Sequence, residues 1–129
     1  MPPAQKDISR RHLLTGAAGE NYAAHYLQTL GYRILQRNYR TRIGEIDIIA
    51  REGEVLVFVE VKTRTGQNFG LPQSAVDVRK QFKITRVALT YLSEKKEHTA
   101  SCRFDIVAVQ KRGTDFQIEL IRNAFEATL

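Results

Sequence analysis

The chain has 129 residues, of which 43% are hydrophobic and 26% are charged, as expected for one soluble domain with a buried core. No apolar run approaches the roughly 18–20 residues of a membrane span, and the first residues lack the apolar stretch of a secretory signal. Twenty Lys and Arg residues against fourteen Asp and Glu residues leave a formal charge of +6, which favours polyanionic partners and nucleic acid first.

The N-terminal region predicts a tail followed by a helix. Residues 1–11 are polar and hold two of the three prolines, so we expect a flexible tail, with a single domain over residues 12–129. Apolar residues at helical spacing then predict a helix over residues 13–30 that ends at Gly31. Glu20 lies within this apolar stripe, where an acid is either buried at a cost or reaches a polar pocket.

The rest of the chain predicts strands around a second helix. A strand over residues 32–40 precedes a hairpin, whose strands span residues 44–50 and 54–63 around a Glu52-Gly53 turn. After a loop, a capping box at residues 74–77 begins the second helix. Its expected buried side consists of Ala75, Val78, Phe82, Leu89 and Leu92. Strands over residues 102–109 and 116–121 follow, then a helical turn at residues 123–127. The order α-β-β-β-α-β-β predicts an α/β fold with a mixed central sheet flanked by helices.

Charged residues interrupt the apolar pattern of the hairpin. Because alternate strand residues share a face, Glu45, Asp47, Glu60 and Lys62 all point to the side opposite the valines of the second strand. The Glu52-Gly53 turn places Glu45 opposite Glu60, and a loop longer by two residues places Asp47 opposite Glu60. Either register gathers the charges at one end of one face.

Carboxylates gathered on a sheet repel one another and need a cation. Lys62 can supply part of this charge, and a hard divalent ion with oxygen ligands, Mg²⁺ or Mn²⁺, can supply the rest. Such an ion suits phosphoryl chemistry, because it neutralises a phosphate and acidifies a bound water. If the first helix covers the charged face, Glu20 adds a further carboxylate.

The ordered set of residues resembles the PD-(D/E)xK nuclease superfamily, which has the restriction-endonuclease-like fold, and more closely the YraN family of bacterial predicted endonucleases. The resemblance covers nearly everything after residue 15. The matching stretches are Gly19-Glu20, Ala23, Leu27, Gly31-Tyr32, Arg37-Asn38, Gly44-Glu45-Ile46-Asp47, Phe58-Val59-Glu60-Val61-Lys62, Lys80, Arg103-Phe104-Asp105 and Asn123-Ala124-Phe125.

The resemblance implies a metal-dependent nuclease that hydrolyses nucleic-acid phosphodiester bonds, with DNA as the preferred substrate and branched DNA included. Asp47 and Glu60 match the metal-binding acids, Lys62 the catalytic lysine, and Glu20 the helix acid of archaeal Holliday-junction resolvases. Ile46 stands where the motif name has proline. The alternatives are a nucleic-acid-binding protein that keeps the fold without catalysis, and a structural protein whose acids pair with its own bases. A homodimer would suit cleavage of both strands of a branched substrate.

Basic residues outside the motif are candidates for phosphate contacts. They are Arg37, Arg40, Arg64, Arg79, Lys80 and Lys83. A polar strand edge explains the first two equally well, and a solvated helix face is the ordinary interpretation of the last three.

Overall fold

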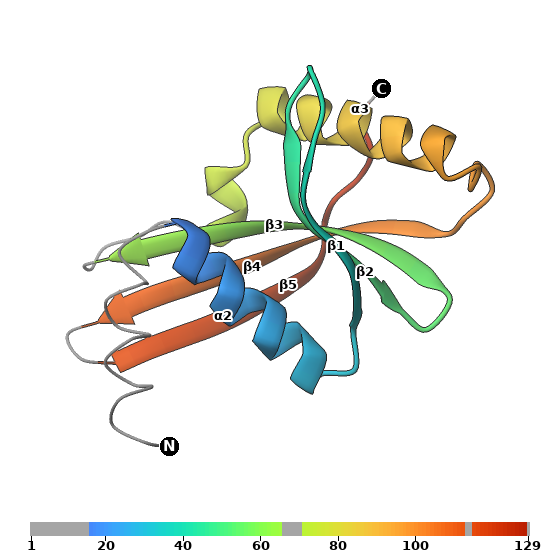
Figure 1. Ribbon diagram of the computed structural model, residues 1–129. Helices are drawn as coiled ribbons and strands as arrows, with labels where there is room; N and C mark the ends of the chain where they lie inside the picture. The colour runs from blue at the N-terminus through green and yellow to red at the C-terminus, as the bar shows by residue number, and fades with distance from the viewer. Residues whose placement is uncertain (1–15, 66–70, 113–114, 129) are drawn as a thin grey trace.

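A five-stranded sheet with one helix on each face forms the molecule in the computed structural model (Figure 1). The structure describes residues 16–65, 71–112 and 115–128, so the predicted tail lies outside the described residues. The elements are α2 (Gly16–Thr29), β1 (Arg33–Arg40), β2 (Glu45–Glu52), β3 (Val55–Thr65), the short 3-10 helix η1 (Pro72–Ala75), α3 (Val78–Glu94), β4 (Cys102–Arg112) and β5 (Asp115–Phe125). In the part of the chain that is described, no helix combines the length and apolar character needed to cross a membrane.

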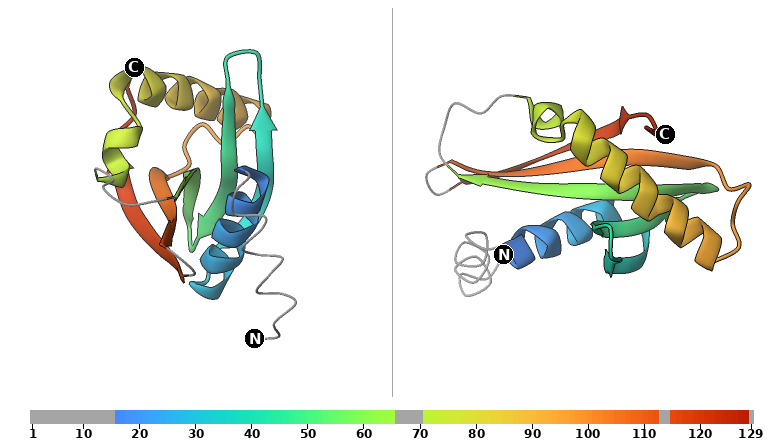
Figure 2. Two further views of the ribbon diagram at one scale, coloured as in Figure 1. Left: turned by 90° about the vertical axis from the view of Figure 1, so that its left-hand side faces the viewer. Right: turned by 90° about the horizontal axis from the view of Figure 1, so that it is seen from above.

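The strands lie in the order β1-β2-β3-β4-β5, which confirms the predicted mixed sheet and element order. Neighbouring strands run antiparallel except for β3 and β4, which are parallel. A parallel pair needs a crossover connection, and α3 supplies it. Viewed along the plane of the sheet, α2 and α3 lie on opposite sides (Figure 2).

Each helix covers a different hydrophobic core. Ala23 and Leu27 of α2 pack on Val57 and Val59, whose side of the sheet was predicted to be apolar. On the other side, α3 packs on a core that includes Ile49, Leu56, Phe58, Phe104 and Ile106. The strands of the centre are therefore buried on both faces, as a sheet between two helix layers requires.

The hairpin turns one residue later than predicted. Glu52 pairs with Val55 and Ile49 pairs with Phe58, so the turn residues are Gly53 and Glu54. Gly53 has a φ of 59°, a left-handed conformation that glycine adopts without steric cost. The register with Glu45 opposite Glu60 is therefore wrong. The observed register is the one that aligns Asp47 with Glu60, but a shifted two-residue turn produces it and not a longer loop.

The buried side of α3 also differs in part from the prediction, of which Leu92 does pack against the core, partly buried. Val78, Phe82 and Leu89 are 69%, 41% and 46% exposed. The buried residues are instead Ile84, Thr85, Val87, Ala88 and Tyr91. Tyr91 packs edge-on against Tyr39 and Phe58, with ring centroids 5.2 and 6.0 Å apart. These aromatic contacts help to hold the buried stripe of α3 on the sheet, and the partner rings belong to β1 and β3, so the helix sequence alone does not identify them.

The helical turn predicted at residues 123–127 is wrong, because β5 continues to Phe125. The Phe125 ring stacks on Phe104 with centroids 4.9 Å apart, which holds the end of β5 on the sheet. Asn123 has a φ of 51°, and its N–H donates to Asp105 Oδ1 across 2.9 Å. The irregular pairing between Phe104 and Ile106 therefore marks a bulge stabilised by a side chain.

A buried polar network ties this bulge to the hairpin end of the sheet. Asp105 is fully buried and accepts hydrogen bonds from Tyr32 Oη at 2.9 Å and from Arg103 Nε at 2.9 Å. Arg103 also pairs with Glu52 at 2.6 Å, and Glu52 pairs with Arg122 at 2.7 Å. A buried carboxylate with several donors is satisfied without any ligand, so this cluster serves folding.

We predict that Asp105→Ala lowers the free energy of unfolding by about 3 kcal/mol, because it removes the buried partner of Arg103, Tyr32 and the Asn123 N–H together. Urea denaturation measures this loss. Glu119→Ala, an exposed acid on β5, is the control and should change stability by less than about 0.5 kcal/mol. Equal stability of the two variants would contradict a structural role for the network.

Candidate functional site

The candidate site forms where β2 and β3 separate. Their pairing runs from the turn to Ile48 and Val59 and ends there. Beyond this point β2 stays paired with β1, whereas β3 stays paired with β4 as far as Thr65. The Asp47 side chain lies in the gap, and its Oδ2 accepts a hydrogen bond from the Val61 N–H at 2.8 Å. A strand N–H that loses its ladder partner is thus satisfied by a carboxylate.

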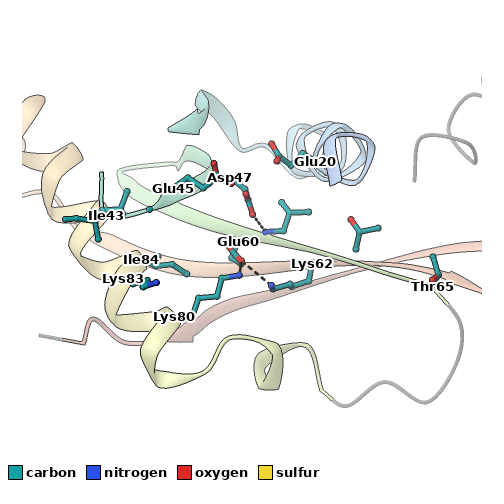
Figure 3. A pocket seen from close by; sticks show the side chains of 14 residues that line it. Glu20, Ile43, Glu45, Asp47, Glu60, Lys62, Thr65, Lys80, Lys83 and Ile84 are labelled. Carbon is teal, nitrogen blue, oxygen red and sulfur yellow. Dashed lines mark hydrogen bonds and ion pairs between the residues drawn. The ribbon is translucent and has the colours of Figure 1, made fainter. Parts of the chain in front are cut away.

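A cleft of about 640 Å³ opens at this gap (Figure 3). Charged residues from four elements line it: Glu20 of α2, Glu45 and Asp47 of β2, Glu60 and Lys62 of β3, and Lys80 and Lys83 of α3. Three acids and the lysine of the predicted motif therefore lie in one cleft.

Asp47 and Glu60 form the buried centre of the cleft. Glu60 is only 7% exposed. Burial, together with the negative charge of Glu60, raises the pKa of Asp47 to about 7, against the lowering effect of the Val61 N–H. A hydrogen bond between the two carboxyl groups and the charge of Glu20 act in the same direction. Burial and the neighbouring negative charge thus disfavour the ionised form of Asp47.

Two lysines contact the same oxygen of Glu60. Lys80 Nζ lies 2.5 Å from Glu60 Oε2, and Lys62 Nζ lies 3.5 Å from it. Burial and the neighbouring Lys80 lower the pKa of Lys62. Burial acts to lower the pKa of Lys80 too, but its hydrogen bond to Glu60 helps raise it overall. The sequence placed Lys62 here and gave Lys80 as either a phosphate contact or a solvated residue of the second helix, so the shorter ion pair, between Lys80 and Glu60, was not expected.

Glu20 reaches the cleft from the side of the sheet opposite Lys80. Glu20 was expected at the site if the first helix covered the charged face, but α2 covers the valine face. Glu20 still lines the cleft, because the separated strands leave it open to both sides. A Cβ added at Gly19 would lie 1.8 Å from Thr63 Oγ1. Glycine thus lets α2 approach β3 closely enough to place Glu20 at the gap.

Glu20 is incompletely paired in this position. Its nearest base is Arg37, with Nη2 3.7 Å from Glu20 Oε1. Glu20 Oε1 and Arg37 Nε are both buried without a hydrogen-bond partner. Burial raises the pKa of Glu20, and the charge of Arg37 opposes the shift. A buried carboxylate oxygen without a donor can accept a ligand.

Comparison with known proteins gives the family. The model of the uncharacterised protein family UPF0102 matches residues 19–109. The chain belongs to UPF0102. A UPF0102 protein of Syntrophus aciditrophicus is 52% identical over 116 residues, which are 90% of this chain and 91% of that protein. A UPF0102 protein of Symbiobacterium thermophilum is 49% identical over 122 residues, which are 93% of this chain and 100% of that protein.

The remaining basic candidates of this UPF0102 chain occupy different places. Lys83 lines the cleft, and Arg79 is exposed at the start of α3. Arg37 pairs with Glu20, and the exposed Arg40 pairs with Glu45 at 3.0 Å. Arg64 lies further along β3, opposite Gln110 of β4. The structure thus brings only Lys80 and Lys83, of the six basic residues, to the lining of the cleft.

Asp47 and Glu60 could hold a hard divalent cation. Within the described ranges, no three His, Cys, Asp or Glu side chains are grouped so that they could enclose a metal. Mg²⁺ often binds through one or two carboxylates and keeps several waters, so a closed cage is not required. The raised pKa of Asp47 and the unpartnered Glu20 oxygen both fit a centre that gains from added positive charge.

We predict that Asp47 makes folding stability depend on pH. Its pKa is raised from 3.8 to about 7, so folding binds a proton between these values. The stabilisation that Asp47 gives to the folded state through its raised pKa is therefore complete at low pH and is lost as the pH rises towards 7. In metal-free buffer, the stability of the wild type relative to Asp47→Asn should fall by about 1–3 kcal/mol between about pH 4 and 8.

Urea denaturation across this pH range measures the difference. Glu45→Gln is the matched control, because Glu45 lies on the same strand but is exposed and paired with Arg40. If the stability of the wild type and that of Asp47→Asn changed in parallel with pH, a raised pKa of Asp47 would be contradicted.

Proposed function

We propose that this UPF0102 chain is a metal-dependent nuclease that hydrolyses nucleic-acid phosphodiester bonds, with DNA preferred. The observation that carries the proposal is the meeting of Asp47, Glu60 and Lys62 where β2 and β3 separate. Acid, acid and lysine in this order resemble the PD-(D/E)xK superfamily and the YraN family. The order of helices and strands supports the further proposal that the fold is restriction-endonuclease-like.

Asp47 and Glu60 would hold Mg²⁺ or Mn²⁺, assisted by Glu20, which lines the same cleft. The ion would neutralise the scissile phosphate and acidify a water. The Val61 N–H fixes the Asp47 carboxylate through its 2.8 Å hydrogen bond, so one ligand is oriented before any ion arrives.

Lys62 acts on the attacking water. Lys62 Nζ lies 3.5 Å from Glu60 Oε2. It would therefore also lie near an ion held by Glu60. Because burial lowers its pKa, Lys62 is more easily neutral than an ordinary lysine and can accept a proton from water. When charged, it stabilises the negative charge that develops on the phosphate.

The surroundings of the cleft suit a polyanion. Lys83 lines it and Arg79 lies exposed on the same helix. With the formal charge of +6, these residues favour backbone phosphates as contacts. Branched DNA as a substrate and a homodimer that cuts both strands remain parts of the proposal. The single cysteine, Cys102, which has no cysteine partner in the chain, supports a reducing, cytoplasmic location as a further part.

A second candidate is a nucleic-acid-binding protein without catalysis. Lys80 and Lys62 both contact Glu60, so that acid is compensated without a metal. Such a protein would bind DNA through the same basic residues but would leave it intact.

The expected result is Mg²⁺- or Mn²⁺-dependent cleavage of DNA that falls by about 100-fold or more in Lys62→Ala and Asp47→Asn, because each removes a group needed in the transition state. Gel assays on single-stranded, duplex, flap and four-way-junction DNA measure the activity and identify the preferred shape. The two variants, purified identically, also control for contaminating nucleases.

Binding without cleavage would favour the second candidate and contradict the nuclease. Metal-dependent stabilisation separates the metal-binding nuclease from a purely structural protein. Saturating Mn²⁺ should raise the thermal unfolding midpoint of the wild type, and Asp47→Asn should lose this effect.

A further inference from the structure

Lys80 is the strongest contact of the acid centre that the nuclease motif does not explain. We propose that Lys80 is an internal counter-ion of Glu60, that a divalent cation displaces it, and that the displaced ammonium then binds a phosphate of the nucleic acid. This inference rests on the proposed function, because it concerns the same metal site.

The contact geometry makes Lys80 the main partner of Glu60. Its Nζ lies 2.5 Å from Glu60 Oε2, 1.0 Å closer than Lys62 Nζ. Figure 3 shows both lysines approaching Glu60 from the side of α3. A carboxylate that is only 7% exposed requires such a partner, because an isolated buried charge is costly.

The position of Lys80 in α3 is unfavourable for the helix itself. Lys80 lies in the first turn, after the N-cap Asp77, whose side chain accepts a hydrogen bond from the Lys80 N–H. The helix dipole disfavours positive charge at this end. Contact with Glu60 compensates for this cost, so the role of Lys80 lies in the cleft and not in stabilising α3.

The rotation of α3 aims Lys80 at the cleft. Lys80, Ile84, Val87 and Tyr91 follow one another at helical spacing, so they form one stripe. The last three are buried against the sheet. The aromatic packing of Tyr91 therefore also directs the first turn of this stripe to Glu60.

A divalent ion between Asp47 and Glu60 would repel both ammonium groups that share Glu60 Oε2. Lys80 is the freer of the two, because its side chain is 39% exposed and that of Lys62 is 26% exposed. Lys80 can therefore turn outward, where Lys83 lies one helical turn away on the same wall of the cleft. Two ammonium groups about one helical turn apart suit contacts with phosphate oxygens of a nucleic-acid backbone.

The first test is Mn²⁺ affinity, measured by isothermal titration calorimetry without nucleic acid. Removing the competing charge in Lys80→Met should tighten Mn²⁺ binding by about 3- to 10-fold. Lys80→Arg keeps the charge and should bind Mn²⁺ nearly as the wild type does. Lys83→Met, from the same helix and cleft, should change the affinity by less than about 2-fold, because among the described residues the ion pairs of Glu60 are with Lys62 and Lys80 and not with Lys83.

Equal or weaker Mn²⁺ binding by a folded Lys80→Met protein would overturn the inference and leave the metal site standing. If neither the wild type nor the variant bound Mn²⁺, the metal site of the proposed function would fail and the inference with it. Circular dichroism and thermal unfolding establish that each variant is folded.

The second test is the salt dependence of DNA binding, measured by fluorescence anisotropy with EDTA or with Ca²⁺, on DNA shown by gel to stay intact. In EDTA, Lys80 is held by Glu60, so Lys80→Met should keep the wild-type slope. With Ca²⁺, the variant should lose about one unit of slope, as expected for one phosphate contact. If Lys80→Met lowered the slope of the salt dependence equally in both buffers, or in neither, the transfer of Lys80 from Glu60 to a phosphate would be overturned.

Discussion

The site depends on one hydrogen bond between a side chain and the main chain. Where β2 leaves β3, the Val61 N–H has no strand partner, and Asp47 Oδ2 accepts its hydrogen bond at 2.8 Å. This contact satisfies an orphaned donor and fixes a carboxylate beside Glu60. Without the separation, Asp47 and Glu60 would be neighbours on a continuous sheet, and Glu20 on the far side could not reach them.

The separation is possible because each half of the sheet is supported independently. Tyr39 and Ile46, paired between β1 and β2, belong to the core under α3, whereas β3 continues beside β4 as far as Thr65. The unfavourable charges are confined to the gap between these halves. The apolar cores on both faces stabilise the fold, so the rest of the domain can offset the cost of burying acids at the gap.

The sequence predicts the helices and strands whose apolar residues recur clearly. It fails where tertiary packing decides which residues are buried or where a strand ends. In β3 the period of two holds, because Glu60 and Lys62 lie opposite the valines, but in β2 it breaks at Asp47. Ile46 belongs to the core under α3 and Ile48 to the core under α2, since the two strands have separated there. For α3, Val78, Phe82 and Leu89 formed a plausible apolar stripe, yet the aromatic contacts of Tyr91 turn another stripe inward. The same orientation of α3 brings Lys80 to Glu60. It therefore accounts both for the unexpected ion pair and for the wrong prediction of the buried stripe. Likewise, the stacking of Phe125 on Phe104 extends β5 over a segment whose local pattern indicated a helical turn.

Anomalous diffraction from crystals soaked in Mn²⁺ would locate a metal ion at the gap between β2 and β3. We predict one strong anomalous peak within coordination distance, about 2.0–2.3 Å, of carboxylate oxygens of both Asp47 and Glu60. The peak should disappear in Asp47→Asn crystals of the same form. A peak elsewhere, or none at saturating Mn²⁺, would contradict a metal site at the gap between β2 and β3.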